Sequence, residues 1–172
     1  MAAPPACLRV CRADYANPVH AKALVNLLDA YAQDPMGGAE PLSEFAKANL
    51  IAALAARPQV FSVLAFDDPL GDGAGLAVGF VNCIEGFSTF ACQPLVNVHD
   101  VAVLAAYRGQ RIAQKMLALA EEIARERGAC KLTLEVLAGN AGALNLYNRA
   151  GFANYQLDPA MGQAQFLQKW LR

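Results

Sequence analysis

A strand, an amphipathic helix and a second strand follow one another between residues 95 and 136, and this unit constrains the fold more than any other part of the chain. Apolar residues dominate Leu95 to Val103. The helix predicted from Ile112 to Arg127 carries its apolar side chains on one stripe. Apolar and polar residues then alternate from Lys131 to Val136. The pattern predicts two parallel strands joined by a right-handed helical crossover.

Upstream residues predict two helices and a set of strands that pair locally. Proline at a first helical position and glycine-bearing breaks delimit the helices, and apolar density marks the strands. We predict strands at Leu8 to Ala13, Val60 to Phe66 and Leu76 to Ile84, helices at Asn17 to Gln33 and Ser43 to Ala56, and a connection at Phe87 to Pro94. The strands are expected to form an antiparallel meander.

The C-terminal part adds one short helix and two strands, which gives the expected fold class. The helix is predicted at Asn140 to Ala150, and the strands at Phe152 to Leu157 and Gln165 to Leu171. The pattern indicates a single α/β (α+β) domain over residues 1–172, with about seven mostly antiparallel strands and four helices. An exposed last strand could also pair with a second copy, which would make the protein a homodimer.

Composition excludes several classes of function. The chain has a net charge of −1, and 56% of its residues are hydrophobic, so we expect no nucleic-acid partner. Its apolar runs are shorter than the roughly 18 residues that a membrane span needs. The five cysteines form no C-x-x-C pair and accompany only two histidines, so we expect no metal site. A soluble, cytoplasmic protein is therefore expected.

The junction between the strand and the long helix has the properties of a phosphate site. Backbone N–H groups in the first turn of a helix lack intrahelical acceptors and lie at the positive end of the helix dipole. Gly109 and the small Ala113 allow close approach of a ligand, and Arg108 adds a cation. Any strand-to-helix turn can contain glycine and arginine, so a structural turn remains the alternative.

Two ordered motifs give the chain a resemblance to the GNAT acetyltransferase superfamily. The segment RGQRIA, residues 108–113, resembles the cofactor loop Q/R-x-x-G-x-G/A, except that Arg111 stands where the family has glycine. If that position requires a positive φ, arginine there costs about 1 kcal/mol. The segment NAGALNLYNRAGF, residues 140–152, reproduces N-x-x-A-x-x-L-Y-x-x-x-G-F.

The resemblance implies acetyl-CoA as co-substrate and a defined place for it. The parallel strands splay apart, the pantetheine arm lies between them, and the pyrophosphate lies on the helix-terminal amides. The implied cofactor-binding residues are Val101, Val103, Arg108, Gly109, Gln110, Arg111, Ile112, Ala113, Gln114 and Asn140.

The resemblance also implies catalytic residues. Tyr147 matches the family's usual general acid for the departing sulfur, and a packing tyrosine is its alternative. His99 is our candidate for the base, because histidine titrates near neutrality and this one lies on the strand of the reaction centre; a core histidine is equally consistent. Asp100 and Glu85 are candidates for binding the amine. Strict alternation places His99 and Asp100 on opposite faces unless a bulge intervenes.

The expected function is direct transfer of acetyl from acetyl-CoA to the primary amine of a small molecule, without an acyl-enzyme. Two alternatives stay open at this point: a protein N-terminal or lysine acetyltransferase, and a non-catalytic acyl-CoA-binding module. Fold alone does not choose among them.

Overall fold

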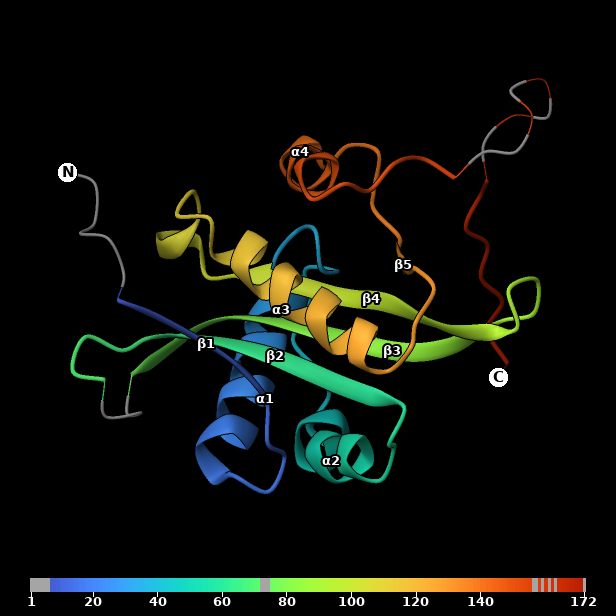
Figure 1. Ribbon diagram of the computed structural model, residues 1–172. Coiled ribbons are helices and arrows are strands. Elements are labelled where there is room, and N and C mark those ends of the chain that lie inside the picture. The colour runs from blue at the N-terminus through green and yellow to red at the C-terminus, as the bar shows by residue number, and fades with distance from the viewer. Residues whose placement is uncertain are drawn as a thin grey trace. The chain divides into compact units, whose positions relative to one another are not determined.

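The computed structural model describes residues 7–71, 75–155, 158, 160, 162 and 164–171. The chain divides after Leu134 into two compact units, Met1–Leu134 and Glu135–Arg172, and each is described by itself (Figure 1). The first unit holds the sheet and three of the helices. The second holds α4 (Ala141–Arg149).

The first unit is built on one mixed sheet whose strand order follows the sequence. The strands are β1 (Leu8–Arg12), β2 (Val60–Asp67), β3 (Leu76–Ser88), β4 (Gln93–Val103) and β5 (Leu132–Leu134), in the order β1-β2-β3-β4-β5. The pairs from β1 to β4 are antiparallel, and β4 pairs with β5 in parallel. The antiparallel meander and the parallel pair are as the sequence predicts.

Helices cover both faces of this sheet (Figure 1). On one face lie α1 (Pro18–Ala32), capped by Asn17, and α2 (Glu44–Ala55), capped by Ser43. The core beneath α1 is formed by buried apolar side chains, namely Leu24, Leu27, Leu64, Phe66 and Phe80.

The opposite face carries α3 (Ile112–Glu126), which connects β4 to β5. Gly79 permits this packing, because a Cβ atom there would lie 2.9 Å from the Met116 Cε atom and 3.0 Å from the Ala102 carbonyl oxygen.

A bulge interrupts β4 at His99. Asn82 is opposite Asp100, whereas the next residue of β3, Cys83, is opposite Val98, so His99 has no partner on β3. A bulge of this kind breaks the alternation of side chains. Strict alternation along β4 therefore does not hold, and His99 and Asp100 do not lie on opposite faces.

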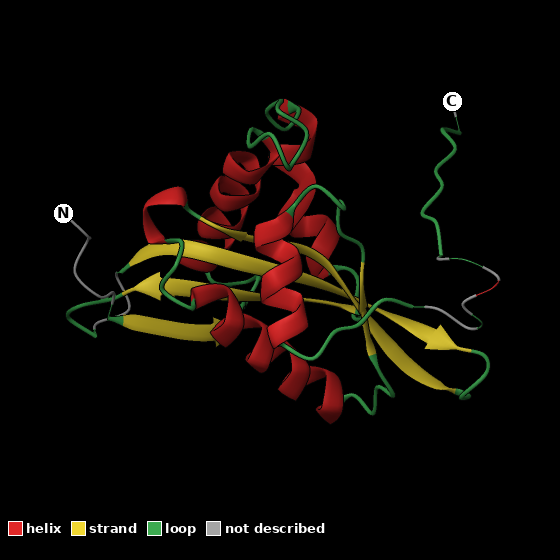
Figure 2. Cartoon of the chain, turned by 90° about the horizontal axis from the view of Figure 1, so that it is seen from above, coloured by secondary structure: helices red, strands yellow, loops and turns green. Residues whose placement is uncertain are grey.

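The hairpin between β3 and β4 corrects a predicted connection. Residues 87–94 were expected to be irregular, but the ladder continues through Phe87 opposite Pro94 and Ser88 opposite Gln93. These strand ends extend past the other strands (Figure 2). The inward-facing backbone groups of the two strands pair with each other there and the outward-facing groups are open to water, so exposed Phe87 and Phe90 do not prevent pairing.

The described residues form five strands rather than about seven. The strand predicted at 131–136 is shorter in the structure, where it spans Leu132–Leu134. Of the predicted strand at 152–157, residues 156 and 157 lie outside the described residues, and 152–155 are irregular. Residues 164–171 form no strand, and Phe166, Leu167 and Trp170 are exposed. Apolar residues in an extended pattern form a strand only where a partner strand and a buried face exist.

Candidate functional site

The N-terminus of α3 differs from those of the other described α-helices. Asn17, Ser43 and Asn140 each accept a backbone N–H with their side chains at the start of α1, α2 and α4. Arg111, the N-cap residue of α3, makes no such hydrogen bond, and the first turn of α3 contains no acidic residue. The positive end of this helix dipole is therefore left for an anion.

The loop before α3 turns its backbone through two left-handed residues. It leaves β4 through a short 3-10 helix (Ala105–Tyr107), then passes Gly109 at φ 81° and Arg111 at φ 60°. The first helical bond inside α3 runs from the Lys115 N–H to the Arg111 carbonyl. The amides of Ile112, Ala113 and Gln114 precede it, in the first turn, where intrahelical acceptors are lacking.

Arg111 occupies a conformation that favours glycine, so we expect Arg111→Gly to stabilise the fold. Left-handed backbone costs a side-chain-bearing residue about 1–2 kcal/mol, from which the extra unfolded-chain entropy of glycine is subtracted. A gain of about 0.5–1 kcal/mol in the free energy of unfolding should appear in urea denaturation. Arg125→Gly, in the last turn of the same helix, should instead destabilise by about 1 kcal/mol. Equal destabilisation by both variants would contradict this reading.

Arg108 joins the loop to two other parts of the first unit. Its Nε atom donates to the Val103 carbonyl oxygen at 3.0 Å, and its Nη2 atom donates to Asp34 Oδ2 at 2.8 Å. The hydrogen bond from Arg108, with a second from the Met36 N–H, holds the pKa of Asp34 below its usual value. The Arg108 side chain remains 58% exposed, so an anion can reach it.

The parallel pairing of β4 with β5 is short. It comprises Val96, Asn97 and Val98 of β4 opposite Leu132, Thr133 and Leu134. Within the described part of the chain, β4 continues to Val103 with its only strand partner, β3, on the other side. The backbone edge at Val101 and Val103 is thus where an extended ligand could add as a strand, although Arg108 holds the Val103 carbonyl.

The bulge gathers polar side chains of β4 on the sheet face that α1 covers. Asp100 Oδ2 accepts from Asn82 Nδ2 at 3.0 Å, and the exposed His99 lies with its Nδ1 atom 3.4 Å from Asn97 Oδ1. Burial raises the pKa of Tyr31, at the end of α1, and the nearby Asp100 and Asp34 carboxylates raise it further. The sequence did not single out Asp34 or Tyr31, because their proximity to β4 depends on how α1 crosses the sheet.

Glu85 lies on the opposite face and is paired. Its Oε2 atom is 3.0 Å from Arg127 Nη1 at the end of α3, and the Arg127 guanidinium also covers the Phe61 ring. The structure therefore does not bring Glu85 together with His99 and Asp100. Its carboxylate has a structural partner that the spacing in the sequence could not show.

The second unit carries the other two predicted site residues. Asn140 caps α4, with its Oδ1 atom accepting the Ala143 N–H at 3.1 Å. Tyr147 lies two turns along α4, half-buried, and its ring meets Phe152 edge-on with centroids 5.9 Å apart. Asn140 thus has a structural role of its own, and the motif from 140 to 152 forms one local helix-and-turn unit.

Comparison with known families accounts for both motifs. Residues 21–152 match the model of the Acetyltransferase (GNAT) family. The chain belongs to this family. The match includes the loop before α3 as well as the α4 segment.

Two relatives of this GNAT chain have named activities. Streptothricin acetyltransferase of Streptomyces lavendulae is 37% identical over 91 residues, which cover 51% of this chain and 48% of that protein. N-alpha-acetyltransferase 30 of Schizosaccharomyces pombe is 36% identical over 56 residues, or 33% of this chain and 37% of that protein. The matched stretches thus span about half or less of these relatives.

Solved GNAT structures share the fold at low sequence identity. A probable acetyltransferase superposes with a TM-score of 0.75 and 21% identity over 95% of this chain and 99% of that chain. Aminoglycoside acetyltransferase AAC(6')-Iy, in complex with the bisubstrate analogue CoA-S-monomethyl-acetylneamine, gives a TM-score of 0.71 and 14% identity over 95% and 98%.

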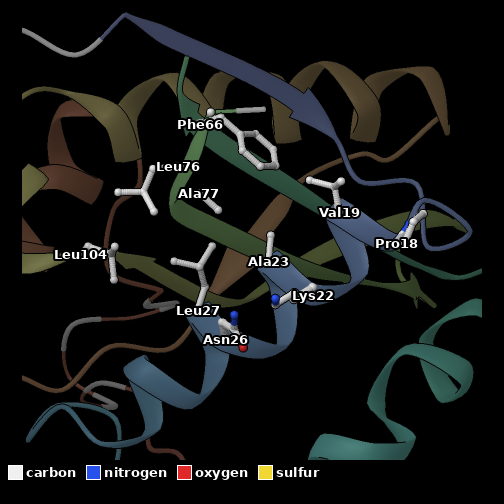
Figure 3. A pocket seen from close by; sticks show the side chains of 11 residues that line it. Pro18, Val19, Lys22, Ala23, Asn26, Leu27, Phe66, Leu76, Ala77 and Leu104 are labelled. Carbon is white, nitrogen blue, oxygen red and sulfur yellow. The ribbon is translucent and has the colours of Figure 1, made fainter. Parts of the chain in front are cut away.

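An apolar cavity of about 760 Å³ opens between α1 and the sheet (Figure 3). Phe66, Leu76 and Leu104 line it from the sheet side, and Lys22 and Asn26 contribute its polar side chains from α1. An ammonium group would lose hydration on entering this lining and would meet the charge of Lys22. The cavity is therefore unsuited to a cationic amine.

One cysteine and one histidine approach each other without forming a nucleophile and base. Cys11 Sγ lies 4.0 Å from His20 Nε2, while His20 Nδ1 accepts the Asp14 N–H at 3.1 Å. An accepting Nδ1 places the proton of the neutral ring on Nε2, which then cannot take the thiol proton. Burial also raises the pKa of Cys11 and lowers that of His20, so both groups are kept neutral.

Two kinds of feature are absent from the described residues. None of the helices there combines the length and apolar character that crossing a bilayer requires. Nor do three or more His, Cys, Asp or Glu side chains gather there as a metal-binding group.

Proposed function

We propose that this GNAT protein is an acetyl-CoA-dependent N-acetyltransferase that transfers acetyl directly to a primary amine of a small molecule. The observation that carries this proposal is the uncapped N-terminus of α3, with two left-handed residues before it. It lies within the loop that matches the family pattern for binding the CoA pyrophosphate. We further propose that residues 1–172 act as one catalytic domain, since the family match spans both compact units.

The proposed cofactor-binding residues suit the pyrophosphate and the pantetheine arm of acetyl-CoA. The amides of Gly109 to Gln114 would receive the pyrophosphate, and Arg108 would add its charge. The free edge of β4 at Val101 and Val103 would pair with the pantetheine amides, and Asn140 is proposed to contact the same arm. Complexes of CoA or a CoA analogue with structural neighbours support this assignment.

The proposed reaction joins the amine nitrogen to the acetyl carbonyl carbon and breaks the bond from that carbon to sulfur. An alkyl ammonium with a pKa near 10 is neutral for only about one molecule in a thousand at pH 7, which costs about 4 kcal/mol. We assign the removal of its proton to His99, directly or through one water. Tyr147 then protonates the departing CoA sulfur.

The acceptor is proposed to be a small amine with more than one positive charge. Asp100 lies near Tyr31 at the end of α1 and supplies the negative charge of this part of the α1 face, because the nearby Asp34 is paired with Arg108. Acetyltransferases for streptothricin and for aminoglycosides among the relatives and structural neighbours support a small-molecule acceptor. Glu85 is not included, because its carboxylate pairs with Arg127.

Release of free CoA thiol in the presence of acetyl-CoA and a panel of acceptors tests the proposal. The panel contains sisomicin, putrescine, a monoamine of similar size, and peptides with a free N-terminus or a lysine. We expect turnover with the multiply charged amines. Turnover confined to the peptides would favour the protein acetyltransferase, and acetyl-CoA binding without turnover of any acceptor would favour the non-catalytic module.

We expect Arg108→Ala to weaken acetyl-CoA binding about five- to tenfold in titration calorimetry. A hydrogen bond to a charged group contributes about 1.5–3 kcal/mol, but the charge of Arg108 is already partly neutralised by Asp34, so we expect a smaller loss. Arg125→Ala, which breaks the exposed pair with Glu121, is the matched control and should bind normally. Equal affinity of Arg108→Ala and native protein would remove Arg108 from the site.

A further inference from the structure

A chain of hydrogen bonds crosses the centre of the sheet and ends at Asp100. Ser62 of β2 and Asn82 of β3 are 0% and 6% exposed, in strands whose other buried residues are almost all apolar. The Tyr15 hydroxyl lies 2.9 Å from Ser62 Oγ, Ser62 Oγ lies 2.6 Å from Asn82 Oδ1, and Asn82 Nδ2 lies 3.0 Å from Asp100 Oδ2.

The direction of every bond in this chain is fixed by chemistry. An ionised carboxylate only accepts, so the amide nitrogen of Asn82 must face Asp100 and its oxygen must face Ser62. That oxygen in turn takes the one hydroxyl proton of Ser62. The Tyr15 hydroxyl must therefore donate to Ser62. All three donors point toward Asp100, and Ser62 and Asn82 each have a partner on both sides in the chain.

Stability alone does not require this arrangement. Buried hydrogen-bonded polar groups contribute little more than apolar side chains of the same shape, but they fix orientation when every member is satisfied. The chain also cannot carry protons, since a carboxamide does not pass on a proton that it accepts. What it can do is hold one oxygen of Asp100 in a fixed direction and leave the other for a ligand.

We propose that Tyr15, Ser62 and Asn82 are positioning residues that orient the Asp100 carboxylate to bind an ammonium group of the acceptor. This inference rests on the proposed function and deepens it. The bulge at His99 places Asp100 on the same face as the proposed base. Asp100 is also near enough to Tyr31 for its charge to raise the pKa of the Tyr31 hydroxyl. Asp100 would thus select acceptors that carry a second positive charge beside the amine that is acetylated.

A double-mutant cycle with Ser62→Ala and Asp100→Asn tests the proposal, with acetyl-CoA and sisomicin as substrates. Ser62→Ala should raise the KM for sisomicin about tenfold and leave the KM for acetyl-CoA unchanged. In the Asp100→Asn background, Ser62→Ala should have no further effect on the KM for sisomicin, because its role acts through the carboxylate. Ser88→Ala, at another buried serine of β3, is the matched control and should not change either KM.

The outcomes separate this proposal from the proposed function. Additive effects of the two substitutions in a protein that acetylates amines would show that Ser62 only supports the fold, and would overturn the positioning role alone. A native protein that acetylates no amine would overturn both. If Ser62→Ala does not fold, Tyr15→Phe provides the same test at the half-buried end of the chain. It should raise the KM for sisomicin less, and again only when Asp100 is present.

Discussion

Tyr147→Phe is expected to lower kcat by about 10²-fold or more and to leave acetyl-CoA affinity nearly unchanged. A hydroxyl that protonates the leaving sulfur acts mainly in the transition state and contributes little to ground-state binding. The substitution keeps the ring that packs edge-on against Phe152, so the fold of the α4 segment should survive. Steady-state kinetics and calorimetry on the same preparation would measure both quantities.

The matched control is Tyr155→Phe, which removes a hydroxyl from the exposed tyrosine of the same compact unit. It should retain native kcat. A kcat for Tyr147→Phe within about twofold of the native value would assign Tyr147 to packing instead. Bulk water would then protonate the sulfur, a credible route because a thiol of pKa near 8.5 is already a fair leaving group.

His99→Ala is expected to remove most of the rate together with the rising limb of the pH profile. If His99 accepts the ammonium proton, only its neutral form is active, so native kcat/KM should increase with pH through one ionisation that is lost in His99→Ala. Because deprotonation of the amine itself gives a similar limb, the profile should be repeated with an acceptor of much lower pKa. His20→Ala serves as control, since the His20 ring is held between the Asp14 N–H and Cys11.

An unchanged rate and profile in His99→Ala would eliminate this role. The proton would then pass to Asp100, which shares the face of His99, or to bulk water. Glu85 is a weaker substitute than its sequence position indicated, because its carboxylate is 3.0 Å from Arg127 on the other face of the sheet.

Local patterns were enough to predict most of the first unit. Asn17-Pro18 marked the start of α1, and the apolar stripe of α3, the apolar segment before it and the alternation after it predicted the parallel pair. The loop at Arg108 was also predictable, since glycine and a helix start are local signals. The left-handed φ of Arg111 was anticipated only as a cost attached to the family pattern, and the structure shows that the residue adopts it.

The missed features depend on contacts between distant segments. The partners of Arg108 and Glu85 are Asp34 and Arg127, which lie 74 and 42 residues away along the chain. The bulge at His99 has no local signal either, because it appears only as a change of register against β3. One signal was present but unused: Ser62 and Asn82 interrupt otherwise apolar strands, and buried polar residues in such positions need partners.

The bulge at His99 constrains the number of residues in β4 more strongly than the identity of the residues at the bulge. Val98 and Val101 lie on the same face of the sheet, although two residues stand between them where regular alternation would have one. Deleting either residue would turn every later side chain of the strand to the other face. The identities of His99 and Asp100, in contrast, concern the face that we propose binds the acceptor. Descendants of this chain could therefore change substrate by substitution at these two positions, but the number of residues there should be preserved.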